Sequence, residues 1–176
     1  IAFIDERLFE TPSIAITECS SFSVEMCELT GMAVKKAVEC LSAHNEELIS
    51  EIAKAEGSID MYEDRLGSYL VRLSGKGLSI RDNRKVSKML HTIGNFERIS
   101  DHALNLTESS KEIFEKKIQM SEQALSEIKR LGDAVLEIVD ITTKAYIDSD
   151  TVLAEKVEPL EQVIDLLGKN IRLHHV

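Results

Sequence analysis

The chain has 176 residues, 43 % of them hydrophobic, which is enough for one substantial core or two small ones. With no Trp, eight Gly and only two Pro, the composition favours long helices and an all-α fold class. The 31 acidic residues outnumber the 21 Lys and Arg, and the resulting net charge of −10 disfavours nucleic acids and anionic lipid surfaces as partners.

Nothing in the sequence indicates a membrane span or a secretory signal, because no stretch reaches the roughly 18 consecutive apolar residues that a span requires. We therefore expect a soluble chain. Its start at Ile1 instead of Met is compatible with a fragment that has an upstream neighbour. The three cysteines, Cys19, Cys27 and Cys40, show no ligand spacing and are expected to be free thiols in a reducing compartment.

Residues 1–19 are predicted to be a lead-in segment, because their periodicity is weak and Pro12 lies near the middle. Ser20 and Ser21 offer N-cap oxygens, and apolar residues recur at helical spacing from Phe22 to about Ala43. The first helix is therefore predicted to begin after these serines.

The next two helices are marked by caps and glycines. Asn45 is the predicted N-cap of a second helix that runs to about Leu73, where the glycines of residues 74–77 can adopt the left-handed conformation that ends a helix. A third, unusually long helix is predicted from about Ile80 to Lys117.

Ser121 opens a predicted fourth helix that ends near Ile147. The acidic turn at residues 148–150 caps a fifth, from about Thr151 to the end of the chain. Pro159 lies inside the fifth helix, so it either kinks that helix or separates its first turn from the rest.

The chain contains an internal repeat. Gly-Met-Ala-Val at residues 31–34 matches Gly-Asp-Ala-Val at 132–135, and Glu-Gly-Ser-Ile-Asp at 56–60 matches Glu-Gln-Val-Ile-Asp at 161–165. The first two helices therefore recur as the fourth and fifth. We predict a three-helix bundle over residues 20–117 and an incomplete two-helix bundle over 118–176. The second bundle would lack its third helix, which predicts that a partner or further residues cover exposed apolar side chains: Val157, Leu160, Ile164, Leu167 and Ile171.

Three Glu residues are each followed four residues later by Asp, and every pair borders an apolar stripe: Glu56 and Asp60, Glu97 and Asp101, Glu161 and Asp165. In a bundle the first two pairs could face each other across a groove. Clustered carboxylates require protons or a hard cation, which indicates Mg²⁺, Mn²⁺, Ca²⁺ or iron, with zinc kept as a further candidate.

The alternative interpretation of these pairs is that they are solvated helix faces without a ligand. His102 follows Asp101 directly, but it lies about 140° round the helix from Glu97, so a packing or capping role is favoured. Asn105 could add an amide oxygen to the site.

The stretch Glu-Arg-Ile-Ser-Asp-His-Ala-Leu-Asn at residues 97–105 closely resembles the Glu-Arg-Ile-x-Asp-His-Ala-x-Asn signature of PhoU proteins. The resemblance covers about residues 20–176. It implies two three-helix bundles related by a pseudo-twofold axis and metal clusters held by the acidic motifs, so Glu56, Asp60, Glu97, Asp101, Glu161 and Asp165 are the candidate ligands. A second copy of the Glu-Arg signature is absent, which would leave a second metal site with at most half its ligands.

Residues 5–15 resemble the segment that joins the membrane part of bacterial Na⁺/phosphate cotransporters to a cytoplasmic PhoU-like domain. The leading hypothesis is thus a non-enzymatic, metal-binding regulatory domain on the cytoplasmic side of the cell membrane. Its expected partners are the membrane transport domain of the same polypeptide and other copies of itself.

Three other hypotheses stay open. One is a free-standing PhoU-type regulator of an ABC phosphate transporter and a sensor kinase. Another is a metal-dependent hydrolase, which ranks low because no base, nucleophile or oxyanion loop accompanies the acids. The last is a helical packing module with no ligand.

Overall fold

A computed structural model describes residues 4–174, and over that range the chain is built from helices with no strand. The predicted all-α fold class is confirmed. The elements, in chain order, are a 3₁₀ helix η1 (Glu6–Glu10), α1 (Pro12–Ser42), α2 (Glu46–Ser74), α3 (Ile80–Glu115), α4 (Glu122–Ile147), α5 (Thr151–Ala154) and α6 (Val157–His174).

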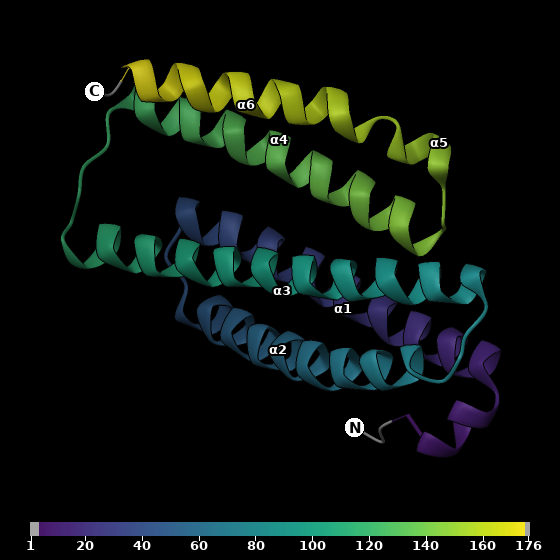
Figure 1. The fold of residues 1–176 in the computed structure, drawn as a ribbon. Coiled ribbons are helices and arrows are strands. Elements are labelled where there is room, and N and C mark those ends of the chain that lie inside the picture. The colour runs from purple at the N-terminus through teal and green to yellow at the C-terminus, as the bar shows by residue number, and fades with distance from the viewer. Residues whose placement is uncertain (1–3, 175–176) are drawn as a thin grey trace.

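Helices α1, α2 and α3 pack together as a bundle, and α4 and α6 form a hairpin that lies along it (Figure 1). The larger core cluster of the bundle joins η1 and the N-terminal half of α1 to α2 and α3, and it includes Met26, Ile59, Leu66 and Ile93, all fully buried. A smaller cluster lies at the other end, around Ala33, Ile52 and Ala103, where α4 also packs.

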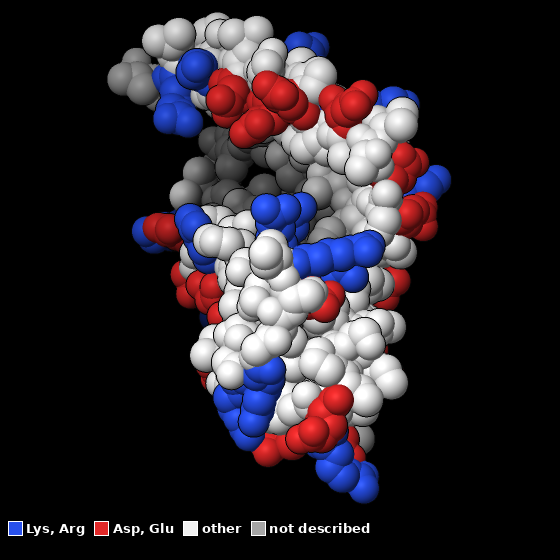
Figure 2. All heavy atoms as spheres, turned by 45° about the vertical axis from the view of Figure 1, so that its right-hand side comes forward, with Lys and Arg blue, Asp and Glu red and all other residues white. Residues whose placement is uncertain are grey.

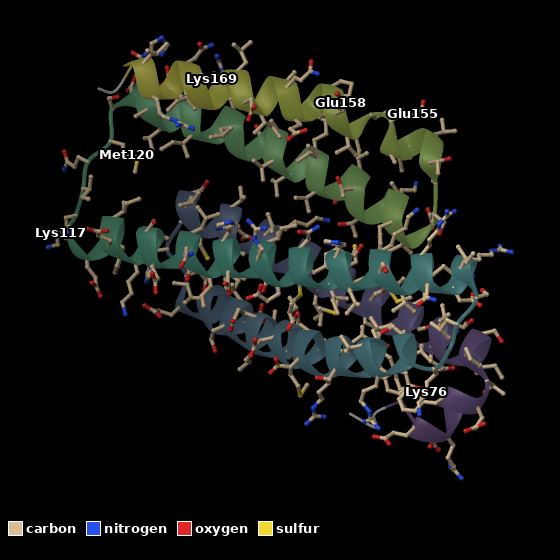
Figure 3. The ribbon with its side chains drawn as sticks, in the orientation of Figure 1. Lys76, Lys117, Met120, Glu155, Glu158 and Lys169 are labelled. Atoms are coloured by element: carbon tan, nitrogen blue, oxygen red, sulfur yellow. The ribbon has the colours of Figure 1, made fainter. Side chains whose placement is uncertain are left out.

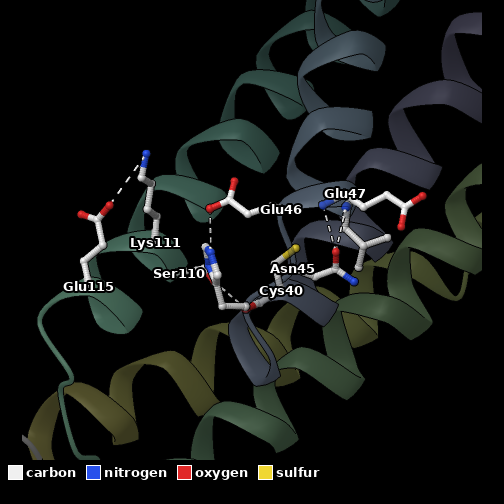
Figure 4. Close-up of polar contacts among 9 residues, drawn as sticks. Cys40, Asn45, Glu46, Glu47, Ser110, Lys111 and Glu115 are labelled. Carbon is white, nitrogen blue, oxygen red and sulfur yellow. Dashed lines mark hydrogen bonds and ion pairs between the residues drawn. The ribbon is translucent and has the colours of Figure 1, made fainter.

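The caps predicted for the second, fourth and fifth helices are present. The Asn45 side chain accepts hydrogen bonds from the backbone N–H groups of Glu47 and Leu48 at 2.9 and 3.3 Å (Figure 4). Ser121 and Asp150 accept equivalent bonds at the starts of α4 and α5. These oxygens satisfy N–H groups that have no partner within the helix, which explains where the helices begin.

The first helix begins earlier than the sequence analysis predicted. It starts at Pro12, which occupies the first helical position, so Ser20 and Ser21 are not its cap. Proline is well tolerated there because its missing N–H would have no helical partner anyway. Residues 12–19 belong to α1, and Ala15, Ile16 and Cys19 are buried in the core. The assignment of 1–19 to a lead-in from an upstream domain stays a prediction, and Ile1–Phe3 lie outside the described residues.

The predicted fifth helix is two helices. A turn at residues 155–156 separates α5 from α6, so Pro159 lies in the first turn of α6 instead of inside a continuous helix, which was the second of the two predicted outcomes. The prediction that Val157, Leu160, Ile164, Leu167 and Ile171 are exposed is wrong. They are half-buried on the side of α6 that packs on α4. The large apolar side chains of α6 that are exposed are Val163, Leu166 and Leu173, at 49, 60 and 78 %.

The two halves meet where α4 packs on α1, and each helix supplies a glycine to the contact. A Cβ atom added to Gly31 of α1 would lie 2.9 Å from Oγ1 of Thr143, and one added to Gly132 of α4 would lie 3.0 Å from Cγ1 of Val38. The helix backbones therefore approach more closely than side chains would permit. These are the two glycines of the internal repeat.

All three cysteines are buried free thiols, as predicted. Burial raises the pKa of Cys19 to about 12. Among the described residues, no helix is both long enough and apolar enough to cross a membrane.

The glycines permit a matched stability test. Gly57→Ala adds a methyl group where nothing lies within 4 Å, and it should raise the free energy of unfolding by about 0.5–1 kcal/mol because alanine favours helix. Gly31→Ala makes the same change against Thr143 and should be at least ~1 kcal/mol less stable than Gly57→Ala, since overpacking opposes the gain. Urea unfolding followed by circular dichroism measures both. Equal stability of the two variants would show that the α1–α4 contact accommodates a methyl group at residue 31 without strain.

Candidate functional site

The acidic residues of α2 lie on the side of that helix that borders α3. Glu56 and Asp60 are one helical turn apart, and Glu63 follows within the same sector, about 20° from Glu56 at 100° per residue. Glu56 and Glu63 are half-buried, and Asp60 is exposed. Their neighbour Ile59 is fully buried, so the acidic row runs along the margin of the hydrophobic core.

On α3 the facing residues are Glu97, which is half-buried, and Asp101, which is exposed. Phe96 and Ser100 on the same two turns are buried and hold the helix against the core. The backbone of α3 is therefore fixed where it presents these two carboxylates, and they meet the acidic row of α2 along the seam between the helices.

Burial and neighbouring negative charge raise the pKa of Glu97. The charges come from Asp101 on its own helix and from Glu63 and Asp60 across the seam, and a hydrogen bond with Asp101 adds to the effect. Burial also raises the pKa of Glu56, followed by the charges of Asp101 and Asp60. Carboxylates of each helix thus raise the pKa of a Glu on the other helix. Binding of a proton or a cation between the two helices would relieve this repulsion.

The structure therefore brings together four of the six predicted site residues. We name the acidic seam by its five carboxylates, Glu56, Asp60, Glu63, Glu97 and Asp101. Glu63 escaped the sequence analysis because the search looked for Glu and Asp four residues apart. The signal that could have found it is its position two helical turns after Glu56.

Glu161 and Asp165 do not join the acidic seam. Both are exposed on α6, which packs on α4, on the far side of α4 from the three-helix bundle (Figure 1). His102 points elsewhere too: it lines an apolar cavity of about 370 Å³ between α1, α3 and α4, together with Ile99 and Val135. Asn105 is exposed.

The oxygen-only donor set of the acidic seam fits a hard cation such as Mg²⁺ or Mn²⁺. In the conformation described for residues 4–174, however, no three or more His, Cys, Asp or Glu side chains are grouped closely enough to hold a metal ion. A bound cation would require the seam side chains to change rotamer, which half-buried and exposed carboxylates at a helix surface can do.

A family model described as the PhoU domain matches residues 24–110, a range that contains the whole acidic seam. A phosphate-specific transport system accessory protein PhoU homolog of Aquifex aeolicus is 28 % identical over 149 residues, which cover 82 % of this chain and 64 % of that protein. PhoU homolog 1 of Thermotoga maritima is 26 % identical over 149 residues, 84 % of this chain and 63 % of that protein.

A third relative, from Clostridium acetobutylicum and of the same description, is 22 % identical over 166 residues, 92 % of this chain and 74 % of its own length. The chain thus spans a little under two thirds of the first two relatives. No solved structure matches the chain.

The raised pKa of Glu97 has a consequence for stability. In the metal-free protein, folding raises the pKa of Glu97, so the folded state penalises the ionised carboxyl at neutral pH. This penalty is relieved as the pH falls through the folded-state pKa, which lies above the usual value for Glu. Glu97→Gln should therefore raise the free energy of unfolding at pH 7 by roughly a few tenths of a kcal/mol, which is measured as a higher melting temperature. This gain should shrink towards pH 4.

A control is Glu112→Gln, because a hydrogen bond with Lys116 lowers the pKa of Glu112. This variant removes a favourable pair and should not raise the melting temperature at pH 7. Loss of stability at pH 7 in Glu97→Gln would contradict the electrostatic account of the seam.

Proposed function

Because this chain belongs to the PhoU family, we propose that it is a regulatory accessory protein of phosphate transport. Three similar proteins carry the description of phosphate-specific transport system accessory proteins, and this is the observation on which the proposal depends. The matched family range lies within the three-helix bundle and ends before α4. The part of the chain that carries the likeness is thus the part that carries the acidic seam.

The proposed role is to bind and control a phosphate transporter, without catalysis, at the cytoplasmic side of the cell membrane. The favoured form is the free-standing regulator of an ABC-type phosphate transporter, because the similar proteins are named as accessory proteins of a phosphate-specific transport system. One observation favours a second form, the regulatory domain of a Na⁺/phosphate symporter: the likeness of residues 5–15 to the segment that precedes such domains. Association of the chain with other copies of itself stays a prediction.

We further propose that the acidic seam is the cation site of this regulator. Glu56, Asp60, Glu97 and Asp101 would supply carboxylate ligands, with Glu63 beside them. A divalent cation would relieve the mutual repulsion of these carboxylates. Its binding would therefore stabilise the packing of α2 against α3. Glu161 and Asp165 would form a separate, weaker site on α6, because their surroundings in the described residues are open to solvent.

The cation proposal predicts the outcome of a calorimetric titration with Mn²⁺, Mg²⁺, Fe²⁺ and Zn²⁺. Glu97→Ala/Asp101→Ala should weaken the affinity of the best-bound ion by at least about 100-fold, since even outer-shell changes cost 10- to 100-fold. The matched control is Glu108→Ala/Glu112→Ala, which removes two acids at the same spacing from the same helix. Both of these residues are exposed and lie outside the seam. Identical binding by the two double variants would show that the seam holds no cation.

The regulatory proposal is tested in a bacterium from which the resident PhoU gene has been deleted. Expression of the chain should restore the normal response of phosphate uptake and of a phosphate-starvation reporter to added phosphate. The Glu108→Ala/Glu112→Ala control should do the same. Failure of the wild-type chain, at an expression level at which it is folded and abundant, would speak against the free-standing form. Restoration only when the chain is fused behind a Na⁺/phosphate symporter would support the second form.

A further inference from the structure

Four cations gather on one side of the first turns of α3, although the protein as a whole is acidic. Arg81, Arg84, Lys85 and Lys88 are all exposed. At 100° per residue they span an arc of about 100°, while Val86, which is buried, lies about 140° from Arg81. We call these four residues the cationic face.

The cationic face is not neutralised within the protein. Among residues 4–174, none of its four members takes part in an ion pair, whereas Arg72, Lys111 and Lys116 do. Other basic side chains, such as Lys35 and Lys36, do meet an acidic partner. The cations at the start of α3, with Asp82 as their acidic neighbour in the sequence, remain able to attract an external anion.

The net charge conceals how unevenly the charges are distributed. Residues 72–88 carry six Lys and Arg and a single Asp, a formal charge of +5, so the remainder of the chain carries −15. Figure 3 places Lys76 in the turn before α3 and Lys117 beyond the opposite end of that helix. The positive charges of residues 72–88 lie in the segment that ends α2 and begins α3, where Arg72 is paired with Glu6 of η1.

Screening weakens the influence of the α3 residues of the acidic seam on the cationic face. Glu97 lies nine positions after Lys88, about 14 Å along the helix axis, which exceeds the Debye length of about 8 Å at physiological ionic strength. Figure 2 shows Lys and Arg gathered below a hollow in the surface and Asp and Glu above it. Lys88 lines a cavity of about 580 Å³ between α1, α3, α4 and α5, together with Asp150. An anionic surface that approached the cationic face would therefore meet mainly positive potential.

An apolar side chain stands exposed beside these cations. Ile80, the first residue of α3, is 77 % exposed and lies about 40° round the helix from Arg84. Clusters of four or more Lys and Arg attract anionic lipid headgroups, and neighbouring apolar side chains can enter the headgroup layer. The phosphates of a nucleic acid would be attracted by the same cations but would leave Ile80 in water.

We propose that the cationic face, together with Ile80, docks the protein on an anionic phospholipid surface. The proposal depends on the distribution of charge and exposed apolar surface and is independent of the proposed role in phosphate transport. The argument from net charge against anionic lipid surfaces applies to the average charge of the molecule and not to the cationic face.

The test is sedimentation of the full chain with vesicles of phosphatidylcholine alone or mixed with an equal amount of phosphatidylglycerol, at low salt. The chain should bind the mixed vesicles and not the neutral ones, and binding should fall as salt is raised. Arg84→Gln/Lys85→Gln/Lys88→Gln should weaken partitioning by about 100-fold, because each basic residue near such a surface contributes roughly fivefold.

The matched control is Lys111→Gln/Lys116→Gln/Lys117→Gln, which gives the same net charge at the other end of α3. It should bind the mixed vesicles like the wild type, and circular dichroism should show both triple variants folded. Equal losses in the two variants, or no binding by the wild type, would overturn the proposal. Binding to polyglutamate or to duplex DNA without binding to vesicles would also overturn it and would assign the face to a macromolecular partner.

Discussion

The structure depends on the close packing of α1, which contacts α2, α3 and α4 on different sides. A helix can have three neighbours at short range only if its side chains are small, and most of its buried residues are: Ala15, Cys19, Ser23, Cys27, Thr30, Gly31, Ala33, Ala37 and Cys40. The hydroxyl groups among them are satisfied locally. Ser23 donates to the carbonyl of Ser20 at 2.8 Å, and Thr30 donates to the carbonyl of Met26 at 2.8 Å. Polar atoms can therefore lie in this core without a large penalty.

Large side chains on the neighbouring helices compensate for the small ones on α1. Leu66 and Leu70 of α2 and Ile93 of α3 are fully buried against it. This arrangement fixes the rotation of α2 and α3 about their own axes. The side of each helix next to its buried side must then face the other helix at the surface, and these two sides carry Glu56 and Glu97. The acidic seam is thus held in place by packing that its own charges oppose. Burial, followed by the neighbouring negative charges, raises the pKa of Glu56 and of Glu97.

The elements that the sequence predicts well are those with local signals. Asn45 and Ser121 mark helix starts by an interaction within three residues, and the facing of Glu56 and Glu97 follows from helical periodicity. The start of α1 was misjudged because Pro12 was taken as a break, although it suits a first turn. The contact of Gly31 with α4 gives no local signal, since it depends on how two distant segments cross. The sequence repeat pointed to these glycines, but their role in close approach needed the structure.

Composition describes the charge of a protein poorly, because the net charge does not record where the charged side chains lie. A net charge of −10 is compatible with an even negative surface, yet α3 carries a positive segment and an acidic seam on one continuous helix. Along α3, Lys88 and Glu97 are separated by more than the screening length, so a cation bound at Glu97 and Asp101 changes the potential at Lys88 little through water. Any influence of one on the other must pass through the packing of α3 against α1 and α2. Met89 and Ile93, both buried, lie between the two regions on that packed side and hold this part of the helix against the core. A shift of α3 caused by closure of the seam would therefore move the cationic face as well, which is a mechanical link and not an electrostatic one.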